Sequence, residues 1–446
     1  MQTWQKTLVG VGGLILLAGI FAYPLGLSAS PGFSTGKAAL MVGGLALIGT
    51  GALGRKTLDL YKTTAILLLN TLVMFVVLEM GLAVAARLGD FLPRAPQPTQ
   101  ERDLRYVDEG REDLPYFQSQ DWAQDYWREY HAAWDDRDLS YQPYVIWRNR
   151  FFEGKTLNID MQGRRLTPGA TCVPGAYRVF TFGGSTMWGT GVPDWGTIPA
   201  FLQAALSERM TQPVCVVNYA EQGWVSTQSV AQLALALRDG ETPDVVIFYD
   251  GNNDAFAAYQ SGAAGGPQNL DSLLARFEAR PPVSPWLALA SQTRTYRLLA
   301  RVAGQPNDQP APPFQAAGID AGALADQIAQ TYLGNLQVVQ ALADDYGFEA
   351  YFFWQTILLV DGKPLTAEEQ SIKQVADNVY PGYAGLYRAA SQRIAEASRT
   401  RPGLHAIMDV FADQTDLVFI DPFHVTVEGN QLIASEMFAT IWGTGK

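Results

Sequence analysis

The chain has 446 residues, of which 48% are hydrophobic and only 17% are charged, with a net charge of −12 and a pI of about 4.8. This length is ample for a full hydrophobic core plus further elements. The acidic balance argues against nucleic-acid binding, which normally needs a basic face. Two Cys and three His argue against a zinc site, which needs clustered ligands, and no phosphate-binding loop motif is present. We therefore expect neither a metal nor a cofactor.

Three apolar stretches occupy residues 1–90, at 8–29, 38–54 and 64–86. Crossing a hydrocarbon core of about 30 Å takes about 20 helical residues, with a lower limit of roughly 17. We therefore predict about three transmembrane helices. A cleaved signal peptide is the alternative for the first stretch, but the two stretches that follow favour an uncleaved anchor. Glu79 in the third stretch is expected to face another helix or the headgroups rather than to be functional.

Basic residues near the apolar stretches predict how the chain is oriented, because such residues are enriched on the cytoplasmic side. Lys6 precedes the first stretch, three basic residues precede the third, and only Lys37 separates the first two. The N-terminus is therefore expected in the cytoplasm, and everything after residue 86 on the outer side. We predict an anchor in the inner membrane of a Gram-negative cell, with the soluble part in the periplasm.

Residues 91–170 are acidic, punctuated by proline and rich in aromatic residues. We interpret them as a linker with a short helix, followed by a hairpin at 144–167 that contains apolar runs at 145–147 and 156–160, a turn near Gly163, and then Arg164 and Arg165. The aromatic side chains suit a sugar or partner surface, but packing against the core is their commoner fate. They are Trp122, Tyr126, Trp127, Tyr130, Trp134 and Tyr141.

From residue 177 onward, short apolar strands alternate with amphipathic helices. This rhythm is typical of a parallel sheet covered on both faces. Residues 255–318, with one Gly-rich and one Pro-rich stretch, break the rhythm and are interpreted as an insertion over the strand C-terminal edge, a candidate lid. The predicted strands are 178–182, 214–218, 245–249, 350–354 and 417–420, and the predicted helices are 198–210, 228–238, 323–346, 383–398 and 427–442.

Polar residues that suit hydrolytic chemistry follow the predicted strands. Ser185 follows the first strand, Gly223 the second and Asn253 the third, while Asp421 and His424 follow the fifth. In open α/β sheets, sites gather at the C-terminal ends of the strands. A Ser, an exposed backbone amide, an Asn and an Asp/His pair are the parts of a serine hydrolase: nucleophile, oxyanion donors, base and orienting group.

These positions resemble the four sequence blocks of the SGNH (GDSL-type) hydrolases. Ser185, Gly223, Asn253 and His424 match the blocks in identity, in order and in position after successive strands. The first block differs, because Gly-Gly-Ser-Thr at 183–186 replaces Gly-Asp-Ser-Leu, and in this it is similar to membrane-anchored bacterial members. The resemblance covers about residues 175–440, with the insertion as a gap. It implies a flavodoxin-like three-layer α/β/α fold for residues 171–446, with a five-stranded parallel sheet of order 2-1-3-4-5.

The resemblance also implies a role for each matching residue. Ser185 would be the nucleophile, His424 its base, and Asp421 the group that orients the imidazole. The Ser185 N–H, the Gly223 N–H and the Asn253 side-chain amide would form the oxyanion hole. The structural alternatives are that Ser185 only caps a helix and that Asp421 is only a turn residue before Pro422.

Further residues of the same edge have less specific expectations. Trp188, Trp224 and Gln355 are candidate substrate-binding residues, with core packing as the equal alternative for the two Trp. Asp254 is expected to position Asn253 or a neighbouring loop. The remaining histidines, His131 and His405, have no matching constellation and are expected to be ordinary surface residues.

Cys172 and Cys215 are a candidate disulfide. Cys172 precedes the first predicted strand and Cys215 lies in the second, and the strand order that the resemblance implies makes these strands neighbours. An oxidising compartment would permit the bridge. Two unrelated buried thiols are the alternative.

Taken with the anchor, these residues predict a membrane-anchored, extracytoplasmic serine esterase or O-acyltransferase. Its expected substrates are acyl esters of envelope glycans or lipids. Residues 8–86 would contact membrane lipids, and other membrane proteins are candidate partners. The alternative is a catalytically silent scaffold of the same fold within a larger membrane assembly.

Overall fold

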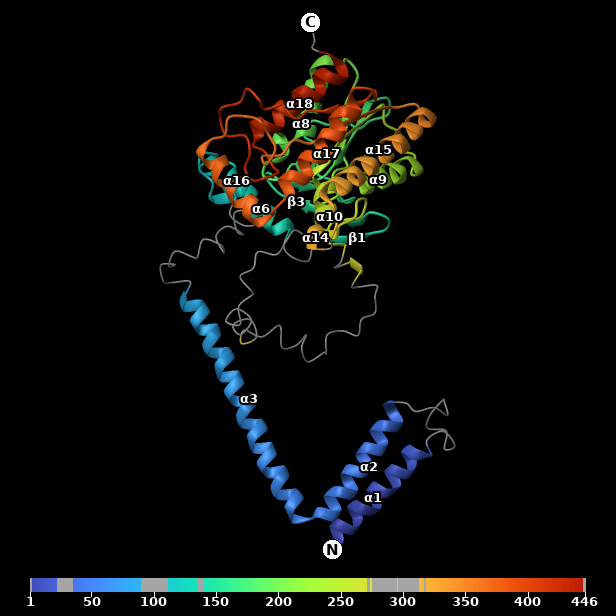
Figure 1. Cartoon of the computed structure of the whole chain (residues 1–446), viewed down its shortest axis with the longest axis vertical. Coiled ribbons are helices and arrows are strands. Elements are labelled where there is room, and N and C mark those ends of the chain that lie inside the picture. The colour runs from blue at the N-terminus through green and yellow to red at the C-terminus, as the bar shows by residue number, and fades with distance from the viewer. Residues whose placement is uncertain are drawn as a thin grey trace. The chain divides into compact units, whose positions relative to one another are not determined.

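The computed structural model describes residues 2–21, 35–89, 111–134, 139–270, 273–274, 295, 313–316 and 318–443. The chain divides into two compact units (Figure 1). One contains Met1–Ala95 with Pro281–Pro306, and the other contains Pro96–Arg280 with Asn307–Lys446. The linker before residue 111, Trp134's side chain and most of the expected insertion after residue 270 lie outside the described residues.

The first unit contains three helices: α1 (Thr3–Ile20), α2 (Thr35–Leu53) and α3 (Arg55–Gly89). By length and composition, two stretches could cross a membrane, namely Thr3–Ile20 and Lys62–Gly81. The prediction of about three spans is wrong for the middle stretch. Its apolar helical part is Leu40–Leu53, which rises only about 21 Å, whereas a hydrocarbon core is about 30 Å thick.

Helices α1 and α2 pack closely through glycine. A Cβ atom added to Gly12 would lie 2.7 Å from the Gly44 carbonyl oxygen, and one added to Gly19 would lie 2.8 Å from the side chain of Met41. Small residues at such contacts let two helix backbones approach each other. On α3, the Glu79 carboxylate accepts a hydrogen bond from the backbone N–H of Thr295 at 2.6 Å. Glu79 thus faces a chain segment, although not a helix of the predicted bundle.

The second unit is built on a parallel sheet. Its strands occur in the order β6-β5-β7-β8-β9, which is 2-1-3-4-5 when they are numbered along the chain. The side chains of the central strand β7 are all buried, as expected for a strand covered on both faces. The strands are β5 (Tyr177–Gly183), β6 (Val214–Asn218), β7 (Val245–Asp250), β8 (Glu349–Trp354) and β9 (Leu404–Ala406).

The prediction of the fifth strand at 417–420 is wrong. This segment forms only an isolated antiparallel bridge, between Phe419 and Val425. The backbone N–H groups of Val418 and Phe419 donate instead to the carboxylate of Glu369, at 3.0 and 3.1 Å. The buried Glu369 side chain thus accepts the hydrogen bonds that a neighbouring strand would otherwise accept. The fifth strand of the sheet is β9 instead.

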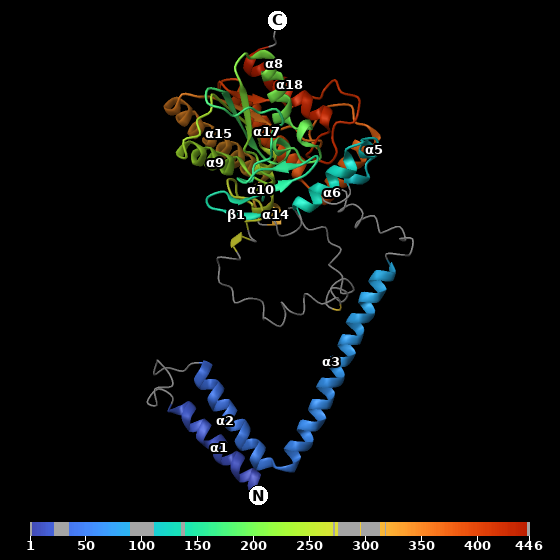
Figure 2. The same ribbon diagram turned by 180° about the vertical axis from the view of Figure 1, so that it is seen from behind.

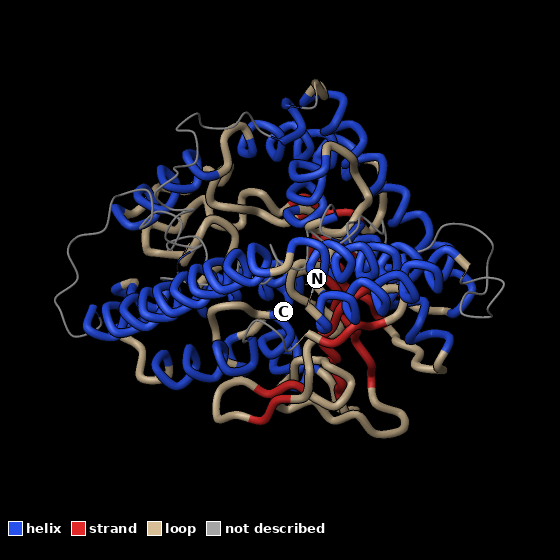
Figure 3. The backbone as a smooth tube through the Cα atoms, turned by 90° about the horizontal axis from the view of Figure 1, so that it is seen from below, coloured by secondary structure: helices blue, strands red, loops and turns tan. Residues whose placement is uncertain are grey.

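Helices cover both faces of the sheet (Figure 1, and from behind in Figure 2). Neighbouring residues of one strand, such as Val179 and Phe180, belong to different core clusters, as the alternation of side chains along a strand requires. Figure 3 shows the same arrangement with strands red and helices blue. The first core contains α8 (Ile198–Arg209) and α18 (Val427–Trp442), and the second contains α9 (Ser226–Arg238), α10 (Asn252–Ser261), α15 (Ala321–Tyr346) and α17 (Tyr383–Ser398).

Among the described helices of ten or more residues, the sequence analysis did not predict α10 and α16. Helix α10 begins within the Asn253 motif and buries Ala255 and Ala258 in the core, so the interpretation of an insertion from residue 255 is wrong for its first residues. Helix α16 (Ala367–Val379) begins with a capping box in which Thr366 and Glu369 satisfy each other's backbone N–H groups. That Thr-x-x-Glu signal is present in the sequence.

Within the second unit, the described residues of 111–170 pack onto the core of the sheet. Tyr126, Trp127 and Tyr130 of α6 (Ala123–Trp134) are buried in the first core, so the core-packing alternative holds for them. Of the hairpin predicted at 144–167, the turn near Gly163 is confirmed, because Asp160 and Arg164 bond across it and Ile159 forms an antiparallel bridge with Arg165. The predicted run at 145–147 is not part of it, since 146–148 pairs with 140–142. The small elements are η1 (Arg111–Asp113), α5 (Pro115–Gln118), β1 (Ser140–Gln142), β2 (Ile146–Arg148), β3 (Phe152–Glu153), β4 (Asn158–Ile159), α7 (Ser185–Trp188), η2 (Asp194–Gly196) and α14 (Pro313–Ala316).

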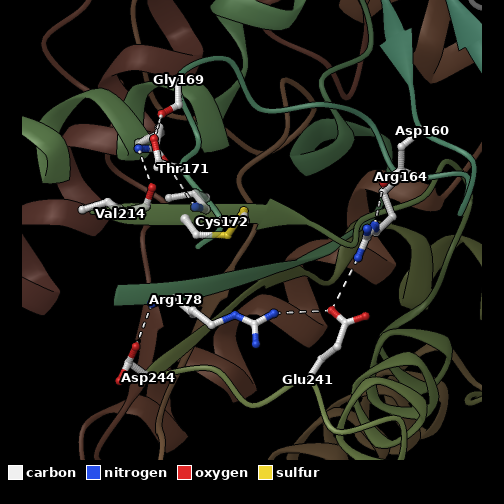
Figure 4. Close-up of a disulfide and its surroundings, with 12 residues drawn as sticks. Asp160, Arg164, Gly169, Thr171, Cys172, Arg178, Val214, Glu241 and Asp244 are labelled. Atoms are coloured by element: carbon white, nitrogen blue, oxygen red, sulfur yellow. Dashed lines mark hydrogen bonds and ion pairs between the residues drawn. A yellow bond between two sulfur atoms is a disulfide. The ribbon is translucent and has the colours of Figure 1, made fainter. Parts of the chain in front are cut away.

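Cys172 and Cys215 form a disulfide, with their Cα atoms 4.8 Å apart (Figure 4). The bond joins the segment before β5 to the strand β6. In the same view, Arg164 and Arg178 both approach the carboxylate of Glu241, at 3.5 and 3.6 Å. The bridge lies toward the start of β6, whereas the predicted site residues follow the strand C-terminal ends.

Candidate active site

Ser185 lies at the first position of α7, directly after β5 and a turn of two glycines. A Cβ atom added to Gly183 would overlap the carbonyl oxygen of Tyr249 and lie 2.9 Å from the Cβ of Met187. The turn therefore requires glycine at this position. Ser185 is partly exposed, although Gly184 and Thr186 on either side of it are buried. Solvent can therefore reach Ser185, while its neighbours are packed into the domain.

Ser185, His424 and Asp421 form one continuous chain of hydrogen bonds. The Ser185 Oγ lies 2.7 Å from His424 Nε2, and His424 Nδ1 lies 2.6 Å from Asp421 Oδ2. The other carboxylate oxygen of Asp421 accepts the backbone N–H groups of Phe423 and His424, both at 2.8 Å. The backbone of its own loop thus holds the Asp421 carboxylate in place. The carboxylate in turn orients the imidazole so that Nε2 faces the Ser185 hydroxyl. This geometry suits transfer of the serine proton to histidine.

Three candidate oxyanion donors lie beside Ser185. Within the described part of the chain, neither the Ser185 N–H nor the Gly223 N–H has a hydrogen-bond acceptor. Gly223 has φ +75°, a left-handed conformation that glycine adopts without a steric penalty. The Asn253 amide nitrogen is so close to Gly184 that a Cβ atom added there would overlap it. A Cβ atom at Gly184 would also lie 3.5 Å from the carbonyl oxygen of Trp224, so Asn253 and the residue after Gly223 both contact the turn that carries Ser185.

Asn253 comes from the first turn of α10, directly after β7 and Gly251. The next residue, Asp254, accepts the backbone N–H and the hydroxyl of Ser226, so it positions the start of α9, as one expectation had it. Burial raises the pKa of Asp254 to about 6. Burial, together with the neighbouring charge of Asp254, raises the pKa of Asp250 well above its ordinary value.

The three candidate substrate-binding residues do not line an open site. The side chains of Trp188 and Trp224 are 1% and 0% exposed, and each is covered by an arginine, Arg165 at 4.5 Å and Arg148 at 4.8 Å from the ring centre. Gln355 is also buried. The core-packing alternative therefore holds for the two Trp, and the substrate-binding prediction is wrong for Gln355 because its side chain is buried and hydrogen-bonded within the domain.

Gln355 instead joins the two loops that carry the triad candidates. Its amide donates to the Thr186 hydroxyl at 2.9 Å and to the Phe423 carbonyl at 3.2 Å. Thr186 follows Ser185, and Phe423 precedes His424. A buried amide that bonds to both neighbours helps to keep the serine and the histidine at hydrogen-bonding distance.

Arg165 holds the loop that follows Ser185. Its guanidinium is buried, pairs with Asp194 at 2.8 Å and donates to the carbonyl oxygens of Trp188, Gly189 and Val192. Burial raises the pKa of Asp194, an effect that the charge of Arg165 opposes. Nothing in the sequence signals this role, because the contacts join residues more than 20 positions apart.

Sequence reasoning also missed the residues that hold the Gly223 loop. Trp147 donates from its indole to the Gln222 carbonyl at 2.9 Å, and its ring would lie 3.4 Å from a Cβ atom at Gly223. Buried Glu221 accepts the backbone and side-chain N–H groups of Asn149 at 2.9 and 2.6 Å. The 147–149 segment was assigned to a hairpin, and only its aromatic residue offered a functional signal.

The other histidines lie elsewhere. His131 is exposed and pairs with Glu112 at 2.7 Å, consistent with the surface expectation. His405 is in β9, partly buried, and burial lowers its pKa, so the expectation of a surface loop is wrong for it. Across the described residues, no group of three or more His, Cys, Asp or Glu could hold a metal ion.

No protein-family model and no curated protein matches the chain. Similar solved structures include a member of the lipolytic G-D-S-L family from Veillonella parvula, 12% identical, covering 60% of this chain and 99% of that one with a TM-score of 0.33. An acetyl xylan esterase from Geobacillus stearothermophilus is 13% identical, covering 60% and 96% with a TM-score of 0.32.

A further similar structure is a lipolytic protein of the G-D-S-L family from Desulfitobacterium hafniense. It is 11% identical, covers 59% of this chain and 99% of that one, and has a TM-score of 0.31. These structural neighbours are hydrolases and esterases.

Proposed function

We propose that the chain is a serine ester hydrolase, with Ser185, His424 and Asp421 as its catalytic triad. The observation that carries the proposal is the hydrogen-bonded chain of these three side chains, at 2.7 and 2.6 Å, beside free backbone donors. A serine that only capped a helix would need neither the imidazole nor the carboxylate behind it. A turn aspartate would not need to bond the imidazole.

The proposed reaction follows from these positions. The Ser185 Oγ attacks the ester carbonyl carbon while its proton passes to His424 Nε2, and Asp421 stabilises the imidazolium. The developing oxyanion is met by the N–H groups of Ser185 and Gly223 and by the Asn253 amide. His424 returns the proton to the leaving alcohol. Water then attacks the acyl-enzyme, giving a carboxylic acid and free Ser185; an acceptor alcohol in place of water would make the enzyme an O-acyltransferase.

We propose that this domain works outside the cytoplasm, attached to the inner membrane. Two stretches long and apolar enough to span a membrane support the anchor. The Cys172–Cys215 disulfide supports an oxidising compartment such as the periplasm. A domain tethered there meets the acyl esters of envelope glycans and lipids, which are the proposed substrates.

The experiment that tests the proposed reaction uses the full chain in detergent with p-nitrophenyl acetate and p-nitrophenyl octanoate. We expect turnover that Ser185→Ala abolishes and that Ser435→Ala, a change at an exposed serine of α18, leaves intact. Preference for acetate would indicate small acyl groups such as those on glycans, and preference for octanoate would indicate lipid-like acyl chains. Folded protein without Ser185-dependent turnover on either ester would contradict the proposal and favour the silent scaffold.

A further inference from the structure

The amide of Asn253 is held at both ends. Its nitrogen donates to the Trp224 carbonyl at 2.7 Å, and its oxygen accepts from the side-chain amide of Gln268 at 3.0 Å. The Trp224 carbonyl can only accept a hydrogen bond, so the nitrogen must be on that side and the oxygen must face Gln268. Of the two hydrogens on the Asn253 nitrogen, the bond to Trp224 uses one.

The second hydrogen on the Asn253 nitrogen is the one that could donate to an oxyanion. The Asn253 nitrogen lies against Gly184, the residue before the candidate nucleophile. An oxyanion donor must be aimed in advance at the position where negative charge develops, because a donor that has to reorient loses much of its effect. Rotation of the Asn253 amide would turn this hydrogen away from Ser185, and the bond from Gln268 opposes that rotation.

Gln268 reaches the site from a segment outside the strand and helix rhythm. It lies in the return segment, residues 262–270, which follows α10 and is tied to that helix where Gln260 accepts the backbone N–H of Asn269 at 3.1 Å. The oxygen of the Gln268 amide would lie 3.7 Å from a Cβ atom at Gly223. One partly exposed glutamine therefore touches Asn253 with its nitrogen and approaches Gly223 with its oxygen.

We propose that Gln268 is a positioning residue that aims the Asn253 amide into the oxyanion hole. This inference rests on the proposed function, since it assigns a role within the same site. The proposal also assigns a function to the return segment, which the sequence identifies only as part of an irregular, Gly-rich stretch. Gln268 touches no reacting atom, so its effect passes through Asn253.

The test compares Gln268→Leu with Gln340→Leu, the same change at an exposed glutamine of α15 that bonds only Asp344. We expect Gln268→Leu to lower kcat for the better p-nitrophenyl ester by about 10- to 100-fold, a range typical of a misplaced catalytic group. KM should stay within about twofold, because the Asn253 amide acts on the transition state. Gln340→Leu should leave both constants unchanged.

A double-mutant cycle separates positioning from general damage. In an Asn253→Ala background, Gln268→Leu should cause no further loss, since the amide that it positions is gone. Additive losses would overturn the inference, and so would a Gln268→Leu enzyme with the kcat of Gln340→Leu. If Gln268→Leu does not fold, Gln268→Glu replaces it. Its carboxylate cannot donate to the Asn253 oxygen, and we expect at least the same loss.

The wild-type enzyme and Ser185→Ala are measured in the same series. Absence of Ser185-dependent turnover would overturn the proposed function, and the role of Gln268 with it. Ser185-dependent turnover combined with an unaffected Gln268→Leu enzyme would overturn only the role of Gln268.

Discussion

The two halves of the candidate site are held by different parts of the chain. In the nucleophile half, which contains Ser185 and His424, the buried side chains of Gln355 and Arg165 hydrogen-bond to the neighbouring loops. The oxyanion half, with Gly223 and Asn253, is fastened largely by Trp147, Gln268 and other residues outside the strand and helix rhythm. We therefore expect core packing to determine the serine–histidine geometry, and the peripheral segments to tune the proposed stabilisation of the transition state.

The largest expected effect lies in the nucleophile half. His424→Ala and Asp421→Asn should each lower kcat by about 10⁴-fold, since the first removes the base and the second gives the imidazole the wrong hydrogen-bond partner. KM and the thermal unfolding midpoint should change little for Asp421→Asn. Steady-state kinetics at neutral pH check this. An Asp421→Asn enzyme with wild-type kcat would mean that the carboxylate is only a turn residue.

The support beneath the nucleophile half should matter for folding. Arg165→Met leaves Asp194 and several carbonyl oxygens buried without their partner, which typically costs about 3–5 kcal/mol. Arg238→Met is the matched control, because the Arg238–Asp239 pair has the same 2.8 Å separation but is exposed on both sides, and such pairs contribute about 0–1 kcal/mol. Urea unfolding of both variants measures the difference. Equal free energies of unfolding would contradict the assigned role.

The oxyanion half can be probed at two glycines. Gly184→Ala should displace the Asn253 amide, because the new methyl group overlaps it, while the backbone conformation at 184 suits any residue. We expect kcat to fall by about 10²–10³-fold, as for loss of an oxyanion donor, with little change in stability. A Cβ atom at Gly223 would make only ordinary van der Waals contacts, with Trp147 at 3.4 Å and Gln268 at 3.7 Å, but the backbone there has a positive φ. Gly223→Ala should therefore lower stability as well. A Gly184→Ala enzyme with full kcat would remove Asn253 from the oxyanion hole.

The smallest expected effect is a pH dependence from the Gly223 loop. Burial raises the pKa of Glu221 from 4.5 to about 7, so between these values the folded chain holds a proton that the unfolded chain has released. Raising the pH through this window therefore lowers the free energy of unfolding. Thermal unfolding at pH 5, 6, 7 and 8 should show a midpoint that falls with pH, and less steeply for Glu221→Gln. Identical slopes would show that Glu221 does not titrate in this range.

Much of the sheet could be predicted because its signal is local. Four strands and five helices lie at or close to their predicted positions, since buried apolar runs and amphipathic spacing depend only on neighbouring residues. The fifth strand was missed because Glu369, about 50 positions away, satisfies the backbone of an equally apolar segment. Strand β9 has three residues with a histidine in the middle, which gives no comparable pattern.

The site residues also differ in whether a local sequence signal could identify them. Ser185 and Asn253 could be predicted because they closely follow the strands β5 and β7, and Gly223 because it lies five residues after β6. The Asp421/His424 pair could be predicted from its motif shortly before the last helix. Trp188, Trp224 and Gln355 share that edge in sequence, yet their side chains point into packed surroundings, which the order of residues does not specify. Gln268 has no signal in the sequence, since its proposed role depends on one hydrogen bond to Asn253, at the other end of α10.

Covalent labelling tests the central claim most directly. The full chain is treated with a fluorophosphonate, which reacts with serines activated by a neighbouring base, and the modified residue is located by mass spectrometry of peptides. We predict one adduct per chain, on Ser185, absent from Ser185→Ala and strongly reduced in His424→Ala. Folded protein that remains unlabelled, or that carries its adduct on another residue, would contradict the assignment of Ser185 and His424 as nucleophile and base.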